Sequence, residues 1–271
     1  MTAVSIQSPQ KNALPLSDFF RDAYRGSSSL VIVTAVFALG FGICSVLPVV
    51  DDRLLLGVSV WGKPAKFFLS LGVHFFTIAW ALSLVSPELR RKAGLCWAVR
   101  LMIAAAIGEM IYIVFRAALA EASHFNTGTP LNAALYAIMG VAALTLTFTA
   151  GFVGFRIWRN RAGDIWREAT GFGLMLGAVL GTLTAGYMSS LTGHGVGGAL
   201  GDATGLPFLH WSTTGGDLRV AHFVGLHAMQ VLPLAALSGK RSVVYGVAVL
   251  VAVLTALTFV QAVMGVPLLA G

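Results

Sequence analysis

The chain has 271 residues, of which 57% are hydrophobic and 11% are charged, and its mean hydropathy is +0.83. Soluble globular domains carry roughly 25% charged residues, so this composition excludes a soluble protein and is typical of an integral membrane protein. The 18 Lys and Arg residues outnumber the 11 Asp and Glu residues, and they concentrate in short segments between apolar runs. Such a distribution is typical of membrane loops and predicts the lipid bilayer, not nucleic acid, as the partner.

A polar segment, residues 1–27, precedes the first apolar run, and its residues Phe19, Phe20 and Tyr24 predict a short helix at the membrane surface. Seven apolar runs follow, each near the ~20 residues that cross the hydrocarbon core. They cover residues 28–49, 66–86, 95–120, 133–155, 170–191, 218–237 and 243–266. The sequence therefore predicts an all-α fold, a polytopic transmembrane bundle of seven helices, with residues 28–271 in a single domain.

Positive residues fall on alternate sides of this predicted bundle. Segment 1–27 and the connections 86–95, 155–170 and 237–243, together with Arg100, hold 13 of the 18 Lys and Arg residues. Because cytoplasmic loops are enriched in Lys and Arg, we expect a cytoplasmic N-terminus and a C-terminus on the outside. The predicted location is the cell inner (plasma) membrane, which the chain crosses several times.

The polar residues inside the apolar runs fall on single helical faces. These faces hold Lys63, Lys66, Ser70, His74 and Thr77 in the second run, Glu109, Tyr112 and Arg116 in the third, and Arg219, His222, His227 and Gln230 in the sixth. Lipid cannot satisfy such groups, so the faces are expected to point into the bundle. A rise of about 1.5 Å per residue places His74, Tyr112 and His227 at one depth and Glu109 and Gln230 at the next. The pattern predicts one cavity lined by His, Glu and Arg side chains in the outer half of the membrane.

The fifth run carries glycines at every fourth position, at Gly173, Gly177 and Gly181. Such a ladder of small residues lets the backbones of two membrane helices come close together. We therefore expect another helix to pack tightly against this face.

The long outer connection, residues 192–217, contains eight glycines. Its apolar residues, Trp211 among them, predict a lid folded over the cavity. Asp217 stands immediately before the sixth run and is expected to be the N-cap of that helix. The residues expected at the mouth, in contact with a small-molecule or lipid ligand from the outer face, are Lys63, Lys66, His124, Asn126 and Trp211.

Several chemistries fit this residue set. His74 and His227 are candidate axial ligands of haem b, and the same pair with Glu109 is a candidate site for a divalent metal such as zinc. A positive ring at the mouth also suits a carboxylate or phosphate; it consists of Lys63, Lys66, Arg116 and Arg219. Glu109 with His74 and His227 suits a proton relay. Two purely structural roles compete with these: a buried Glu109–Arg116 ion pair, and lysines that reach toward lipid headgroups.

The leading functional hypothesis is a metal- or haem-dependent binding or catalytic site. One alternative is a proton-coupled transporter or channel for a small anion, and another is a non-catalytic subunit of a membrane complex. The sequence leaves open whether the protein is an enzyme. The candidate catalytic residues are Glu109, Tyr112, Arg116, Arg219, His222 and Gln230.

The motifs Trp211-Ser-Thr-Thr-Gly-Gly-Asp-Leu-Arg219 and His222-Phe-x-Gly-x-His-Ala-x-Gln230 resemble those of a family of bacterial seven-helix inner-membrane proteins. This resemblance implies the topology and the choice of site residues, and it implies no activity. A looser, architectural similarity is to the seven-helix membrane hydrolases related to alkaline ceramidases and progestin/adipoQ receptors, which hold zinc with histidines and an aspartate. The chain departs from their closing His-x-x-x-His pattern, because His222 and His227 are five positions apart.

Overall fold

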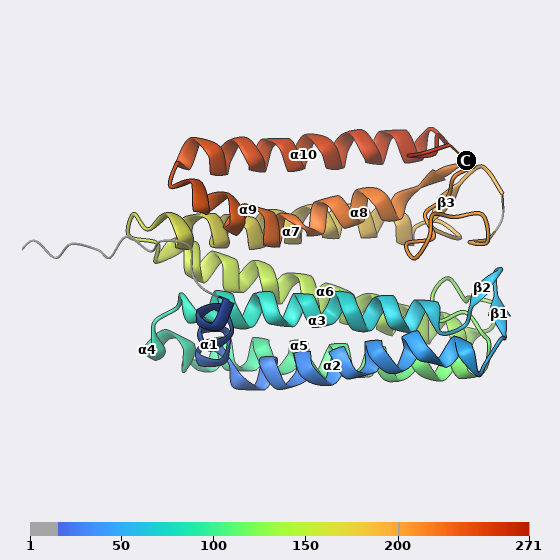
Figure 1. Ribbon diagram of the computed structural model, residues 1–271, viewed down its shortest axis with the longest axis horizontal. Helices are drawn as coiled ribbons and strands as arrows, with labels where there is room; N and C mark the ends of the chain where they lie inside the picture. Colours follow the sequence, from blue (N-terminus) through green and yellow to red (C-terminus); the bar gives the residue numbers. More distant parts are fainter. Residues whose placement is uncertain (1–15, 200, 271) are drawn as a thin grey trace, which may run out of the picture.

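The computed structural model describes residues 16–199 and 201–270, and these residues form a helical bundle (Figure 1). Within the described residues, seven helices are long and apolar enough to cross a membrane, which confirms the predicted fold class. The predicted N-terminal segment is described from Leu16 onward. The spanning helices are α2 (Ser28–Val46, continued by η1, Leu47–Val49), α3 (Gly62–Ser83), α5 (Ala93–Ala118), α6 (Pro130–Arg159), α7 (Ile165–Ser189), α8 (Leu218–Leu226) with α9 (Ala228–Ala235) and η2 (Ala236–Ser238), and α10 (Arg241–Val263).

Short elements mark the two ends of the bundle (Figure 1). We call one end the basic end; it carries α1 (Leu16–Gly26), α4 (Pro87–Arg90) and the connection from α6 to α7. The other is the loop end, with two antiparallel pairs: β1 (Leu54–Leu55) with β2 (Val58–Ser59), and β3 (Gly195–Val196) with β4 (Gly216–Asp217). Helix α1 confirms the predicted short helix before the first span, and the ring of Phe19 lies 5.3 Å from Phe76 and 5.2 Å from Trp80 of α3.

The helices differ from the predicted runs mainly at their ends. Helix α3 begins at Gly62, four residues earlier than expected, because Lys63 and Lys66 belong to its first turns and lower the local hydropathy. Helix α6 begins at Pro130, where the Thr129 hydroxyl accepts a hydrogen bond from the Asn132 backbone N–H at 3.2 Å. This N-cap and the proline at the first helical position extend the helix beyond its apolar run.

The spanning helices form two groups (Figure 1): α2, α3, α5 and α6 lie on one side, and α7 to α10 on the other. Helices α6 and α7 meet toward the basic end, where a Cβ on Gly154 would lie 2.7 Å from the Gly171 carbonyl oxygen. Nearer mid-bundle, the Gln230 amide of α9 donates to the Thr77 hydroxyl of α3 at 3.0 Å. The two groups are thus joined by one close backbone crossing and one polar side-chain contact, among other packing.

Helices α8 and α9 pack against the glycine ladder of α7, as the spacing predicts. A Cβ on Gly173 would lie 2.7 Å from the Ala228 carbonyl oxygen, and one on Gly177 would lie 2.6 Å from Met229 Cγ. One on Gly181 would lie 2.4 Å from Leu226 Cδ2. Only residues without a side chain allow this approach, which holds the polar face of α8 in place.

Gly173→Ala is expected to lower the free energy of unfolding by about 1–3 kcal/mol, since the added methyl group meets a backbone carbonyl that cannot turn away. Gly186→Ala on the same helix is the matched control, because its Cβ would have no neighbour within 4 Å. That control should be neutral or stabilising by up to about 1 kcal/mol through helix propensity. Thermal unfolding of the purified protein in detergent measures both, and equal losses would contradict the role of the ladder.

Candidate functional site at the loop end

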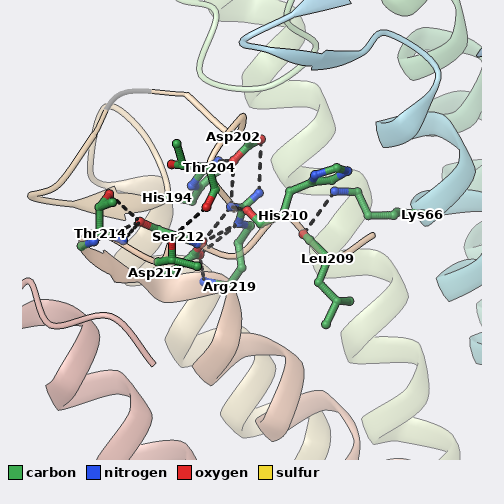
Figure 2. Close-up of polar contacts among 12 residues, drawn as sticks. Lys66, His194, Asp202, Thr204, Leu209, His210, Ser212, Thr214, Asp217 and Arg219 are labelled. Carbon is green, nitrogen blue, oxygen red and sulfur yellow. Dashed lines mark hydrogen bonds and ion pairs between the residues drawn. The ribbon is translucent and has the colours of Figure 1, made fainter. Parts of the chain in front are cut away.

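Arg219, in the first turn of α8, is held between two carboxylates (Figure 2). Its Nη2 donates to Asp217 Oδ2 at 2.7 Å, to Asp202 Oδ1 at 2.9 Å and to the His210 carbonyl oxygen at 2.5 Å. Its Nε donates to Asp217 Oδ1 at 2.9 Å. These contacts occupy the guanidinium, and the two carboxylates offset its charge. Arg219 therefore stabilises the fold and is not available to bind a ligand at the mouth.

Asp217 has a second role as the N-cap of α8, as the sequence predicts. Its carboxylate accepts hydrogen bonds from the backbone N–H of Arg219 at 3.0 Å and of Ser212 at 2.9 Å. Burial acts to raise the pKa of Asp217, but the hydrogen bonds and charge of Arg219 outweigh it and hold the pKa below its usual value. The carboxylate is therefore ionised, and it joins the start of α8 to the loop before it.

The glycine-rich connection 192–217 is folded by its own backbone bonds. Strand β3 pairs with β4, and the Ser212 hydroxyl accepts from the Gly215 N–H at 3.0 Å. The chain passes so close to α10 that a Cβ on Gly216 would lie 1.9 Å from the Ala262 carbonyl oxygen, which requires glycine there. The Thr214 hydroxyl accepts from the Ala199 N–H at 2.9 Å. The described residues of the connection form a cap beside the polar face of α8, and the movement of this cap as a lid stays a prediction.

Two lysines in the first turns of α3 lie next to this cap. Lys66 Nζ donates to the Leu209 carbonyl oxygen at 3.3 Å (Figure 2). Burial and the charge of Lys66 lower the pKa of His210, so that imidazole is neutral at pH 7. Lys63 is partly buried, and its Nζ lies 5.8 Å from the Phe67 ring. Among the described residues, Lys63 has neither a hydrogen-bond partner nor an ion-pair partner, although Asp202 and Glu109 are near enough for their charges to act on it.

A layer of polar atoms without partners lies deeper in the same half of the bundle. Glu109 of α5 is only 4% exposed. Its Oε1, the Tyr112 hydroxyl and His74 Nε2 are buried without a hydrogen-bond partner among the described residues. Buried polar groups are normally paired, so these three atoms mark this part of the bundle as a candidate binding site.

The predicted Glu109–Arg116 ion pair is wrong. Arg116 Nη2 pairs with Glu121 at 2.8 Å, and Nη1 donates to Asn132 Oδ1 at 3.4 Å. The reason is the turn after α5: Ala120 has a φ of 54°, and the chain folds back so that Glu121 reaches the guanidinium first. Arg116 thereby holds the 119–129 connection and leaves Glu109 without this cation.

The candidate mouth residues His124 and Asn126 lie in this connection. The His124 ring packs between Phe67, at 5.5 Å, and Tyr136, at 6.0 Å. Burial, and then the charge of Lys63, lower the pKa of His124 to about 3, so this imidazole is neutral at pH 7. The Asn126 amide donates to the Ala122 carbonyl oxygen at 3.1 Å and accepts from Asn132 at 3.1 Å. His124 is therefore near Lys63, whereas Asn126 stabilises the turn.

His222 of α8 and His227, the C-cap of that helix, each form hydrogen bonds through one ring nitrogen among the described residues. His222 Nδ1 lies 3.0 Å from the Thr184 hydroxyl and 3.1 Å from the Gly181 carbonyl oxygen. His227 Nδ1 lies 2.7 Å from the Phe223 carbonyl oxygen, and its ring lies 3.9 Å from the Phe223 ring. Trp211 packs on the same Phe223 ring at 5.3 Å. His222 thus faces α7, while His227 and Trp211 share an aromatic surface.

The metal hypothesis receives no support from the geometry. Within the part of the chain that the structure describes, no group of three His, Cys, Asp or Glu side chains is arranged to hold a metal ion. The predicted set of His74, His227 and Glu109 is included in that statement.

Asp202 was not among the predicted site residues; it pairs with Arg219, and its Oδ1 lies 3.6 Å from His194 Nε2. Burial, followed by the charge of Arg219, lowers the pKa of His194. One signal was available: Asp202 and Asp217 are the only two acidic residues in the 192–217 connection. A second carboxylate beside a capping aspartate could have been assigned to the nearest arginine.

The seven apolar helices and the buried polar layer between them define a multi-pass integral membrane protein. Comparison of the chain with family models, with curated proteins and with solved structures gives no match.

Proposed function

We propose that this membrane protein binds a small anion, of the carboxylate or phosphate class, at Lys63 and Lys66 beneath the 192–217 cap. The observation that carries the proposal is the Lys63 ammonium, which is partly buried and has no hydrogen-bond partner among the described residues. A half-buried lysine that lies beside a second lysine and has no carboxylate bonded to it in the described part of the chain is best explained by a ligand that supplies the missing negative charge.

The local charge balance supports the same ligand class. Asp202 is close enough for its charge to act on both lysines, Asp217 is close enough to act on Lys66, and Arg219 acts on both lysines. Three cations against two carboxylates leave one positive charge, and Arg219 is the cation that both carboxylates engage. The surplus therefore lies with the lysines, where either Glu109 or a bound anion can balance it. When an anion replaces Glu109 as the counterion of the lysines, Glu109 would take up a proton. Anion binding would then be coupled to proton uptake, as in the transporter alternative.

The positive-inside rule supports an orientation for the proposed site. The basic end holds most of the Lys and Arg residues and belongs in the cytoplasm, so the loop end faces the outside of the plasma membrane. The anion would then arrive from the outer face.

Isothermal titration calorimetry tests the proposal. Purified full-length protein in an uncharged detergent is titrated with acetate, succinate and inorganic phosphate, and with acetamide as the uncharged control. We expect saturable binding of at least one anion, weakened by added salt, and none of acetamide. Failure of all three anions to bind would overturn the proposal.

A b-type haem between His74 and His227 is a second candidate, supported by the state of the two rings. The bond of His227 Nδ1 to the Phe223 carbonyl oxygen leaves Nε2 free, an arrangement typical of ligand imidazoles. His74 Nε2 is likewise buried and without a partner among the described residues. When bound, haem would supply redox or oxygen chemistry.

An absorption spectrum of the purified protein checks this candidate. Haem ligation predicts a Soret band that disappears in His74→Ala and in His227→Ala. A folded, colourless preparation after expression with added haem precursor would exclude it.

A further inference from the structure

The basic end of the bundle contains a pocket of about 410 Å³, far from the proposed anion site. It lies where the end of α3 and α4 face the end of α6 and the start of α7. Pockets that bind small ligands have volumes of about 300–1,000 Å³, so this one is large enough for a headgroup-sized molecule.

Three cations line this pocket: Lys92, Arg156 and Arg167. Among the described residues, neither Lys92 nor Arg156 has a carboxylate within ion-pair distance. Arg167 makes a long contact, 3.9 Å, to the Asp164 carboxylate, and its Nη1 donates to the Asn160 carbonyl oxygen at 3.3 Å. A single carboxylate, Glu88, lies in the wall, so the pocket has a clear positive excess.

The two acidic residues nearby, Glu168 and Asp164, form hydrogen bonds with other groups. Glu168 accepts from Arg241 at 3.1 Å and from the Tyr245 hydroxyl at 2.5 Å. Asp164 caps α7 through the backbone N–H of Trp166 at 2.8 Å. Neither is free to neutralise Arg156, so an external anion would find the positive excess of the pocket available.

The remaining wall is mostly aliphatic, with Leu89 and Ile157 among its residues, and Ser86 and Asn160 add two uncharged polar side chains. A lining of arginine and lysine beside aliphatic side chains suits a ligand with a phosphate group on an apolar or glycerol part. Basic pockets between membrane helices bind the headgroups of anionic lipids in this way.

We infer that this pocket binds an anionic phosphate ester through Arg156, Lys92 and Arg167. Two sources carry that chemistry: the headgroup of an anionic phospholipid, and a soluble phosphate ester. Glu88 opposes the ligand. Its own backbone N–H and the Ser86 hydroxyl hold its pKa below the usual value, so the wall carries a negative charge at pH 7.

Titration of the purified full-length protein in uncharged detergent tests this inference with three probes: dihexanoyl phosphatidylglycerol, dihexanoyl phosphatidylcholine and glycerol 3-phosphate. We expect phosphatidylglycerol to bind more tightly than phosphatidylcholine. Arg156→Gln should weaken that binding by about tenfold, and Glu88→Gln should strengthen it by a few-fold, roughly. Arg159→Gln is the matched control, because Arg159 lies on the same helix, is exposed and does not line the pocket.

The probes distinguish the two sources. Binding of phosphatidylglycerol without glycerol 3-phosphate assigns a lipid, and equal binding of both assigns a soluble phosphate ester. The inference is overturned if phosphatidylglycerol binds no better than phosphatidylcholine while glycerol 3-phosphate does not bind, or if Arg159→Gln weakens binding as much as Arg156→Gln. Opposite signs for Arg156→Gln and Glu88→Gln cannot arise from simple misfolding, which would weaken both.

Discussion

Lys63→Met is expected to weaken anion binding by at least about thirtyfold and, at the same time, to stabilise the ligand-free protein. The methionine has nearly the shape of the lysine stem but carries no charge, so the anion loses its counterion. Without ligand, the wild-type protein holds a partly buried ammonium for which the described residues provide no hydrogen bond. Removal of this charge should raise the free energy of unfolding by about 1–2 kcal/mol. Calorimetric titration and thermal unfolding measure the two effects.

Lys240→Met is the control for this variant, because Lys240 is exposed at the basic end and the change in net charge is the same. It should alter neither binding nor stability. Glu109→Gln should strengthen anion binding, since it removes the carboxylate that competes for Lys63. A Lys63→Met protein that unfolds more easily than the wild type would show that the ammonium is already satisfied within the fold, and the proposed site would lose its basis.

Arg219→Met is expected to lower the free energy of unfolding by about 3–5 kcal/mol, the cost of leaving buried carboxylates without their cation. Asp217 is 3% exposed and would keep its backbone hydrogen bonds but lose three contacts from one guanidinium, while Asp202 would lose its arginine. The 192–217 connection should then open. Thermal unfolding measures the loss of stability, and limited proteolysis at this connection reports its release.

A second arginine at the same end provides the comparison. Arg53 pairs with Asp51 at 2.8 Å, but its side chain is 47% exposed. Arg53→Met should therefore cost at most about 1 kcal/mol. A similar loss in both variants would mean that burial of the Arg219 cluster adds nothing to its contribution.

The spans could be predicted from the sequence because hydropathy over about 20 residues reports the length of the membrane crossing directly. The Gly173–Gly181 ladder could be predicted for a similar reason: its spacing lies within one helix. Helix ends were less accurate where polar residues continue the helix, as Lys63 does in α3. The N-cap Thr129 and Pro130 were readable signals that place the start of α6 correctly.

The partners of the polar residues could not be predicted in the same way. Helical spacing placed Glu109 and Arg116 on one face, but the ion pair of Arg116 depends on a sharp turn at Ala120, outside any periodic pattern. Asp202 lies in a glycine-rich connection whose path is set by close backbone contacts with α10. Periodicity describes a helix face, whereas pairing depends on where a loop brings its side chains.

Helices α6 and α7 cross closely at Gly154 and Gly171, near the basic end. If the two groups of helices rotated relative to one another, this crossing would be the pivot of the rotation. The displacement of a residue in such a rotation grows with its distance from the pivot. Tyr187 is about 24 Å from Gly171 along α7 at 1.5 Å per residue. A rotation of about 5° between the two groups of helices would part them by roughly 2 Å at the loop end and hardly at all at the crossing. Lys63 and Lys66 therefore lie where a small rotation would change the separation of the two groups of helices most. The two glycines that permit the close crossing determine that this change would occur at the loop end.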